Sequence, residues 1–196
     1  MTALRKPELL TFEQYLDAEA SAPTRHEFLA GEVHAMAGAT AAHNLLAGSI
    51  YAALFSHLKG RPCRPFMSDM KLKIRYDESD SVYYPDVMVD CSGLAPAALF
   101  TTSPTVLVEV LSQSTERIDR REKWWIYRTI ETLQEYVLID QQKAEVTIFR
   151  RSASWVEEVL GSKESVIDLP SLGFRCTVAD IYADVQLPGE KPLAFV

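Results

Sequence analysis

Two strongly apolar segments of this chain each contain one carboxylate, and this pattern limits the possible structures more than any other feature. Asp86 lies in YYPDVMV, and Glu109 lies in VLVEVLS. Charged side chains are rarely buried unless they pair with an opposite charge or bind a metal ion. Two simpler interpretations stay open. Asp86 follows a proline and fits the end of a strand, and Glu109 fits a salt bridge to an arginine.

Strand geometry predicts how the two carboxylates are placed. Residues two apart share a face of a strand, so Glu109 lies with Leu107 and Leu111, and Asp86 lies with Tyr84 and Met88. Apolar residues on both faces predict strands that are covered on both sides. If the strands are neighbours, about 4.8 Å apart, the carboxylates face each other. Such a pair repels unless a cation binds, and oxygen ligands suit magnesium or manganese.

A predicted helix after the second strand brings a cation to the same place. Asp119, followed by Glu122, fits an N-cap with an acidic residue at the third helical position. One face of this helix carries Lys123 and, at the following helical positions, Ile126, Tyr127 and Ile130. This spacing directs Lys123 toward the sheet. The alternative is a lysine whose stem lies along apolar surface while its ammonium stays in water.

The elements before and after this region predict an α/β fold. A helix capped by Thr11 precedes a hairpin that turns at Ala30-Gly31, and Thr40 caps a long helix. An alternating strand at 69–76 follows, and a strand at 82–89 returns antiparallel to it. The Glu109 strand, the Lys123 helix and a strand near 133–140 come next. The predicted core order is therefore helix, strand, strand, strand, helix, strand, with a mixed sheet extended by N- and C-terminal hairpins.

Length and charge further narrow the classes of protein to which this chain can belong. With 196 residues the chain is expected to form one domain, 1–196, and no apolar run approaches the ~20 residues of a membrane span. The N-terminus does not resemble a secretory signal. A net charge of -7 argues against nonspecific nucleic-acid binding by the whole surface. A local basic cluster remains, for which a solvated helix face is the alternative; it comprises Arg117, Arg120, Arg121, Lys123 and Arg128.

Cysteines and histidines point to no zinc site. Cys63, Cys91 and Cys176 are widely spaced and contain no CxxC pair, so neither zinc nor a disulfide framework is predicted, and a reducing cytoplasm is the expected compartment. No ligand spacing links the histidines, which are interpreted as structural or surface groups; they are His26, His34, His43 and His57.

Pro85-Asp86, followed by Glu109 in an apolar strand, resembles the PD-(D/E)XK restriction-endonuclease-like superfamily, and the predicted order is similar to its αβββαβ core. Nearly the whole chain is similar to one branch, the Uma-two family of restriction-endonuclease-like proteins. The phrases that carry this resemblance include LTFEQYL, RHEFLAGEVHAMAGAT, YYPDVMV, VEVLSQST, DRREKWWIYR and LPSLGFRCTVADIY.

One position departs from the superfamily pattern. The superfamily places a lysine two residues after the acidic strand residue, and this chain has Leu111 there. Lys123 is the expected replacement, and Lys123 with Tyr127 resembles the Gln-x-x-x-Tyr helix motif of RecB-like nucleases. Lys71 and Lys73 are weaker substitutes. If no lysine reaches the site, the fold is kept without the activity.

The resemblance implies a metal-dependent endonuclease that hydrolyses DNA phosphodiesters. It implies Mg²⁺ (or Mn²⁺) held by Asp86, Glu109 and the main-chain carbonyl of Val110, with Lys123 as the third catalytic group. Glu32, just after the hairpin turn, is expected either to complete the metal shell or to be exposed. A homodimer that pairs through the hairpin at 144–161 is the expected assembly. Two alternatives are an inactive DNA- or protein-binding module, and an unrelated fold in which Glu109 forms a core salt bridge.

Overall fold

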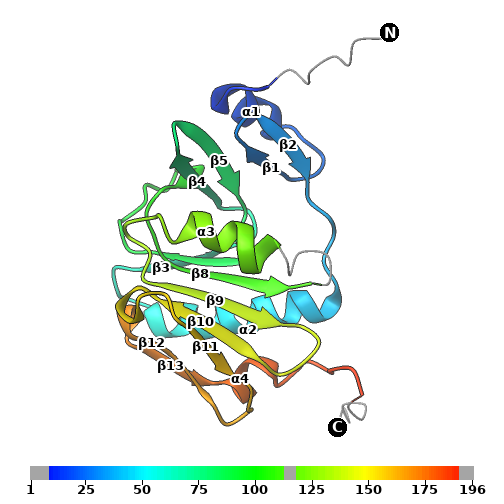
Figure 1. Ribbon diagram of the computed structural model, residues 1–196, viewed down its shortest axis with the longest axis vertical. Coiled ribbons are helices and arrows are strands. Elements are labelled where there is room, and N and C mark those ends of the chain that lie inside the picture. Colours follow the sequence, from blue (N-terminus) through cyan, green and yellow to red (C-terminus); the bar gives the residue numbers. More distant parts are fainter. Residues whose placement is uncertain (1–8, 113–117, 190–196) are drawn as a thin grey trace.

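A six-stranded mixed sheet forms the central layer of the protein (Figure 1). The structure is a computed structural model that describes residues 9–112 and 118–189, with the side chains of 118–120 left out. The strand order is β11-β10-β9-β8-β6-β3. Its core elements are, in chain order, α2 (Ala41–Leu58), β3 (Arg64–Met67), β6 (Val87–Asp90), β8 (Pro104–Leu111), α3 (Trp124–Tyr127) and β9 (Glu135–Asp140). This is the predicted order, and the α/β fold prediction is confirmed.

Helices cover the two faces of this sheet, as the apolar pattern predicted. Figure 1 shows α2 behind the sheet and α3 in front of it. The valines of β8 face the α2 side, where they meet the buried stripe of that helix. Leu107 and Leu111 face the α3 side, where they pack with Tyr127. Glu109 therefore emerges on the face that α3 covers, because it shares the parity of the two leucines.

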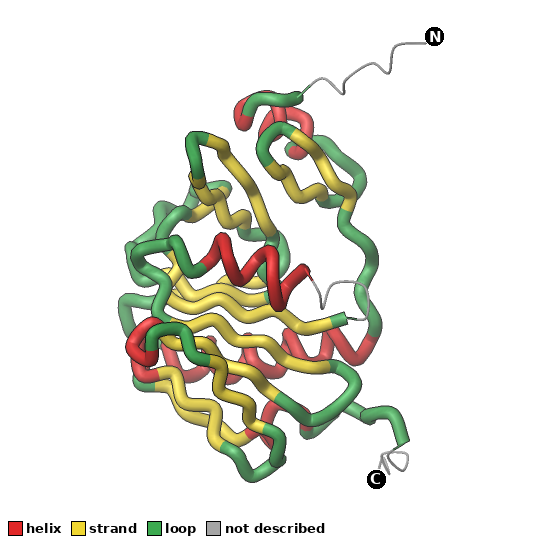
Figure 2. The backbone as a smooth tube through the Cα atoms, viewed as in Figure 1, coloured by secondary structure: helices red, strands yellow, loops and turns green. Residues whose placement is uncertain are grey.

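A second sheet of five strands stands beside the first (Figure 2). Its order is β2-β1-β5-β4-β7, made of β1 (His26–Leu29), β2 (Glu32–Ala35), β4 (Lys71–Tyr76), β5 (Ser79–Tyr83) and β7 (Phe100–Thr101). This arrangement corrects the prediction that the strand at 69–76 and the N-terminal hairpin belong to the core sheet. Of the segment at 82–89, only the second half joins the core sheet, as β6. The first core strand is instead β3, whose short sequence RPFM has no clear period.

The segment at 82–89 is two strands rather than one. The first, β5, ends at Tyr83 and the second, β6, begins at Val87, so the chain passes from one sheet to the other at Tyr84-Pro85-Asp86. Pro85 has no N–H to give to a ladder, which favours a break here. Asp86 consequently lies just before its strand, and the predicted shared face with Tyr84 does not exist.

The helices and hairpins near the two ends of the chain begin and turn at the residues that the sequence predicted. Thr11 begins α1 (Phe12–Glu19) with a capping box to Gln14. The hairpin β1–β2 turns at Ala30 and Gly31, whose φ angles are 49° and 99°. A Cβ at Gly31 would come within 2.8 Å of the Leu9 side chain, so glycine is required there. The hairpin formed by β10 and β11 extends the core sheet, as predicted. The C-terminal elements are β10 (Val146–Arg150), β11 (Glu157–Leu160), β12 (Val166–Leu169), β13 (Phe174–Thr177) and α4 (Val178–Tyr182). Short 3₁₀ turns lie at Arg151–Ala153 and Pro170–Leu172.

The helix that carries Lys123 differs from its prediction. A π-helical turn, Ile118–Lys123, runs directly into α3, so Asp119 lies inside the helix and is not its N-cap. The helix also ends sooner than expected, at Tyr127. Within 9–112 and 118–189, no helix is long and apolar enough to cross a membrane.

Cys63 and Cys91 form a disulfide, which corrects the prediction of no disulfide framework. They flank the antiparallel pair β3–β6, in which Arg64 lies opposite Asp90, so the two Cα atoms are 4.0 Å apart. A sequence separation of 28 residues hides this pairing from local motifs. The prediction of a reducing cytoplasm rested on the absence of disulfides, and this bond removes that argument. Cys176 is a free thiol.

We expect reduction of this disulfide to lower the free energy of unfolding by about 3 kcal/mol, because the bond closes a loop in the unfolded chain. Urea denaturation with and without dithiothreitol measures the difference. A Cys63→Ser/Cys91→Ser variant should match the reduced protein and ignore the reductant. Alkylation of all three cysteines in denatured, unreduced protein would contradict the bond.

Candidate active site

Asp86 and Glu109 meet where β6 begins and β8 nears its end. The two strands are antiparallel neighbours with Val87 opposite Val108, so Asp86 and Glu109 occupy the next pair of positions. The Asp86 N–H donates to Glu109 Oε2 at 3.4 Å, and the Val110 N–H donates to Asp86 Oδ2 at 2.7 Å. The Glu109 side chain is only 4% exposed, whereas that of Asp86 is 21% exposed. One carboxylate is therefore buried, and the other lies beside it with access to solvent.

The Lys123 side chain points at Glu109 rather than at water. Its ammonium lies 3.2 Å from Glu109 Oε1 and 3.2 Å from Glu27 Oε1, and its side chain is 9% exposed. Tyr127, one helical turn later, donates its hydroxyl to the same Glu109 oxygen at 3.0 Å. The lysine closes the π-helical turn before α3, and such turns are frequent at functional sites. Among the described side chains, the cation that contacts Glu109 from the helix is Lys123.

Two tyrosines make the inner wall of the site. Burial, reinforced by the Glu109 carboxylate, raises the pKa of Tyr127 well above its ordinary value. Burial and the nearby Glu27 carboxylate raise the pKa of Tyr83 to about 12. The two rings pack edge to face with centroids 5.5 Å apart. Tyr127 therefore stays protonated at neutral pH and remains a hydrogen-bond donor to Glu109.

His43 is a site residue that the sequence interpretation assigned to the structural or surface class. Its Nε2 lies 3.2 Å from Asp86 Oδ2, and its side chain is 15% exposed. Thr40 caps α2 by accepting a hydrogen bond from the His43 N–H, which fixes His43 in the first turn of the helix. The available signal was its place in the first turn after a predicted cap, but nothing local connected it to Asp86.

Glu27, and not Glu32, is the third acidic side chain that contacts this group of residues. Glu27 lies on β1 and reaches Lys123, with its side chain 19% exposed. Glu32 lies on the edge strand β2, where its carboxylate is 57% exposed and pairs with His34 at 3.7 Å. The structure does not bring Glu32 into contact with Lys123, Asp86 or Glu109. A charged residue next to the buried Phe28 was the signal for Glu27 that the sequence interpretation missed.

The other lysine candidates lie elsewhere. Leu111, which occupies the position of the superfamily lysine, is buried in the cluster under α3. Lys73 pairs with Asp80 at 3.1 Å, and its Nζ lies 3.6 Å from the centroid of the Phe12 ring. Lys71 has its Nζ 5.3 Å from the centroid of the Tyr84 ring. Lys123 is thus the candidate lysine that contacts Glu109.

The donors at this site suit an open metal centre. No group of three or more His, Cys, Asp and Glu side chains with metal-binding geometry occurs in the described part of the chain. Two adjacent carboxylates with a neighbouring carbonyl are instead the kind of oxygen donors that Mg²⁺ uses when it keeps several of its waters. The donor set therefore fits Mg²⁺ or Mn²⁺ and does not fit a closed structural zinc site.

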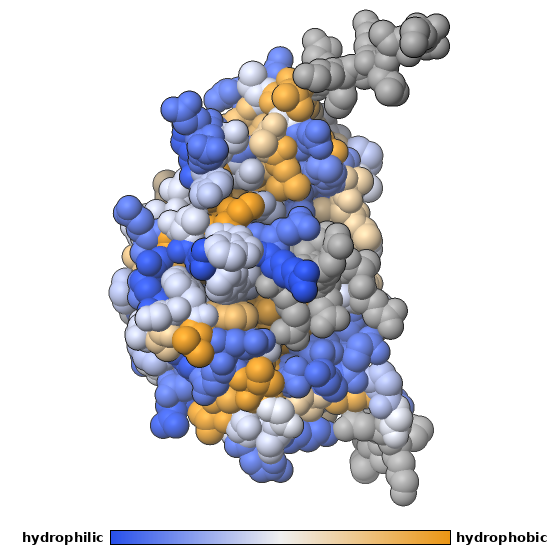
Figure 3. Space-filling model, in the orientation of Figure 1, coloured by the Kyte–Doolittle hydropathy of each residue, from blue (hydrophilic) through white to orange (hydrophobic). Residues whose placement is uncertain are grey.

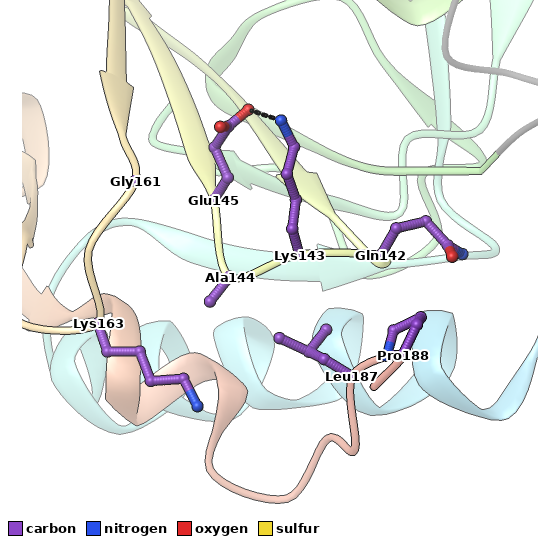
Figure 4. A pocket seen from close by; sticks show the side chains of 8 residues that line it. All are labelled: Gln142, Lys143, Ala144, Glu145, Gly161, Lys163, Leu187 and Pro188. Atoms are coloured by element: carbon purple, nitrogen blue, oxygen red, sulfur yellow. Dashed lines mark ion pairs between the residues drawn. The ribbon is translucent and has the colours of Figure 1, made fainter. Parts of the chain in front are cut away.

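A separate pocket of about 420 Å³ lies away from these residues. Figure 4 shows it between the turn after β9 and the segment after α4, with Leu187 and Pro188 on one side and Lys143, paired with Glu145, on the other. None of its lining side chains belongs to the Asp86–Glu109 site. The pocket and the candidate active site are therefore distinct.

A family model and several known proteins match most of the length of this chain. A family model described as "Putative restriction endonuclease", Uma2, matches residues 12–179. The chain belongs to the Uma2 family. The matched region includes every residue of the candidate site, from Glu27 to Tyr127. The resemblance to the Uma-two family is thereby confirmed.

Two similar proteins come from Synechocystis sp., and a similar solved structure comes from Anabaena variabilis. The "Uncharacterized protein sll1609" of Synechocystis sp. is 40% identical over 148 residues, which is 72% of this chain and 80% of the relative. The "Uncharacterized protein slr1290" of the same organism is 30% identical over 175 residues, covering 88% and 91%. Among solved structures, "a putative nuclease belonging to DUF820" from Anabaena variabilis has a TM-score of 0.69 at 18% identity, covering 89% of this chain and 98% of that one. This last likeness shows the shared fold.

Proposed function

We propose that this Uma2 protein is a metal-dependent endonuclease that hydrolyses DNA phosphodiester bonds. The observation that supports this most directly is the contact between the Lys123 ammonium and Glu109, next to Asp86. Two carboxylates and a lysine are the groups that the superfamily pattern requires. Here the lysine comes from the helix because the usual strand position is Leu111. Membership of a nuclease-like family supports the same activity.

Asp86, Glu109 and the carbonyl of Val110 would hold Mg²⁺ or Mn²⁺. In a strand, the N–H and C=O of one residue point to the same side, and the Val110 N–H points to Asp86. The Val110 carbonyl therefore faces the carboxylate too, beyond the last ladder pair of β6 and β8. When bound, the ion would polarise the scissile phosphate and lower the pKa of a water molecule.

The remaining groups hold this arrangement and supply charge. Lys123 would donate hydrogen bonds to the attacking water or to the phosphate oxygens as negative charge develops. Glu27 keeps the lysine side chain in place from β1, and Tyr127 fixes one oxygen of Glu109. His43 orients Asp86 from α2. An inactive binding module has no need for a buried lysine directed at two carboxylates, so this contact favours catalysis.

Cleavage of both strands is most simply organised by two copies of the chain. We propose a homodimer through β11, the outer strand of the core sheet, whose Val159 is 52% exposed. An exposed edge strand with an apolar side chain offers unpaired backbone groups to a second copy. Light scattering of the purified protein tests this assembly, and a strictly monomeric mass would refute it.

The metal site is tested by calorimetric titration with Mn²⁺. We expect wild-type protein to bind Mn²⁺ and the Asp86→Ala/Glu109→Ala variant to lose the heat of binding, because both carboxylate ligands are gone. Glu32→Ala is the matched control, since it removes an exposed carboxylate outside the site. Wild-type protein that gives no heat of binding and no change in thermal stability with Mn²⁺ would contradict the proposed metal dependence.

A further inference from the structure

Two of the three tryptophans of the chain pack on the hydrophobic cluster beside the helix that follows Lys123, and the third lies next to one of them. Trp124 and Trp155 lie partly buried against this cluster. Trp125 is 57% exposed and meets Trp124 edge to face, with ring centroids 5.1 Å apart. An indole left in water gives up a large hydrophobic contribution to folding. Its exposure next to a second indole indicates a surface that meets a ligand.

One guanidinium group, that of Arg128, lies over both of these indole rings. The Arg128 Cζ is 3.5 Å from the centroid of Trp125 and 4.5 Å from that of Trp124. Within the described part of the chain, Arg128 forms no ion pair, so its charge is available to an anion. Arg121 is exposed on the same helical segment. Figure 3 shows strongly hydrophilic side chains gathered at the level of α3. The predicted basic cluster is thus partly present here; Arg117 and the Arg120 side chain lie outside the described residues.

A second tryptophan–arginine pair stands on the neighbouring turn. Arg151 Cζ lies 5.1 Å from the centroid of the Trp155 ring. Ser154 and Trp155 have φ angles of 54° and 62°, in the left-handed region that bulky residues rarely adopt. Such conformations persist where the surrounding structure holds them, and they gather at binding sites. The turn holds Trp155 beside Arg151 in this backbone conformation.

We propose that Trp124, Trp125 and Arg128, here termed the indole platform, bind unpaired bases of single-stranded nucleic acid. Aromatic and guanidinium planes stack on bases of any sequence, and an arginine supplies charge for the phosphates. In a duplex the base faces are already covered, so an exposed indole selects unpaired bases. This inference rests on the proposed nuclease function, to which it adds a preference for single-stranded regions.

The position of the indole platform fits this role. Trp125 follows Lys123 by two residues and so projects from a different side of the helix, about one helix diameter (~10 Å) away. A strand stacked on Trp125 would cross the N-terminal turn of this helix to reach Lys123 and Glu109. The positive charge of Arg128 contrasts with the chain's net charge of -7, so the attraction of a polyanion is local.

Fluorescence anisotropy in EDTA tests the platform, because without metal the nucleic acid is bound but not cut. The probes are a short fluorescein-labelled single strand and the matching duplex. We expect Trp125→Ala to weaken single-strand binding about tenfold and duplex binding less. Trp125→Phe, which keeps a stacking ring, should bind nearly as wild type does. Arg128→Lys, which keeps the charge but loses the plane, should be intermediate. Tyr76→Ala removes an equally exposed ring (57%) elsewhere and should change nothing.

The outcomes separate the platform from the chemistry. Single-strand binding by Trp125→Ala within twofold of wild type would overturn the platform and leave the proposed hydrolysis untouched. Wild-type protein that binds neither probe, but changes its oligomeric state on Trp125→Ala, would show a protein interface and would also overturn it. Trp125-dependent binding without any metal-dependent cleavage would support the platform and refute the nuclease proposal.

Discussion

Asp86→Asn is expected to reduce metal-dependent DNA cleavage at least about a hundredfold, because a bound metal ion supplies several kcal/mol of transition-state stabilisation. Asparagine keeps an oxygen that can accept the Val110 N–H, so the local hydrogen bond that Asp86 makes is preserved. The negative charge that would attract the ion is lost. The fold should therefore remain intact while the chemistry disappears.

Cleavage of supercoiled plasmid in Mg²⁺ or Mn²⁺ measures this effect, with chelator-treated protein as the zero level. Glu32→Gln makes the same chemical change at a carboxylate that is 57% exposed and pairs with His34. It should cut at the wild-type rate. An Asp86→Asn protein that retains a tenth or more of wild-type activity would exclude Asp86 as an essential metal ligand. Chelator-resistant cleavage would exclude the metal itself.

Lys123→Met is expected to destabilise the fold by about 3–5 kcal/mol, the usual cost of removing one partner from a buried ion pair. Lys123 lies between Glu27 and Glu109, whose side chains are 19% and 4% exposed. Without the ammonium, the two carboxylates lose their shared cation. Glu109 then remains as a buried negative charge without the Lys123 ammonium, although it still accepts hydrogen bonds from the Tyr127 hydroxyl and the Asp86 N–H.

Urea denaturation of Lys123→Met and of the Lys123→Met/Glu109→Gln double variant distinguishes this cause from lost packing. The double variant should recover part of the stability, because it removes the unpaired charge. Lys143→Met is the matched control: Lys143 pairs with Glu145 at 2.9 Å, but its side chain is 60% exposed. An exposed pair contributes about 0–1 kcal/mol. A Lys123→Met cost of the same small size would mean that the buried contact contributes little.

Features with a local physical cause could be predicted from the sequence. The alternation along β8 placed Glu109 on the face of Leu107 and Leu111, and the structure has it there. Thr11 and Thr40 cap the predicted helices, because their hydroxyls accept from backbone N–H groups three residues later. The turn at Ala30-Gly31 also lies where the hairpin signal put it.

Features that depend on distant partners could not be predicted. Nothing in the alternating sequence of β4 shows which sheet the strand joins, and RPFM in β3 has no period to mark it as a core strand. His43 and Glu27 joined the site through contacts with Asp86 and Lys123, which come from remote parts of the chain. The Cys63–Cys91 bond has the same origin, since only the pairing of β3 with β6 brings the cysteines together.

The candidate site draws on widely separated parts of the chain, and this has a consequence for incomplete polypeptides. Glu27 comes from the second sheet, Asp86 from the crossing between sheets, and Lys123 from the helix after β8. A nascent polypeptide that stops before residue 123 lacks the lysine, and a proteolytic fragment that starts after residue 86 lacks a carboxylate. Interrupted synthesis or partial degradation would therefore release chemically silent pieces, and the capacity to cut nucleic acid would belong only to a chain that has been completed and folded.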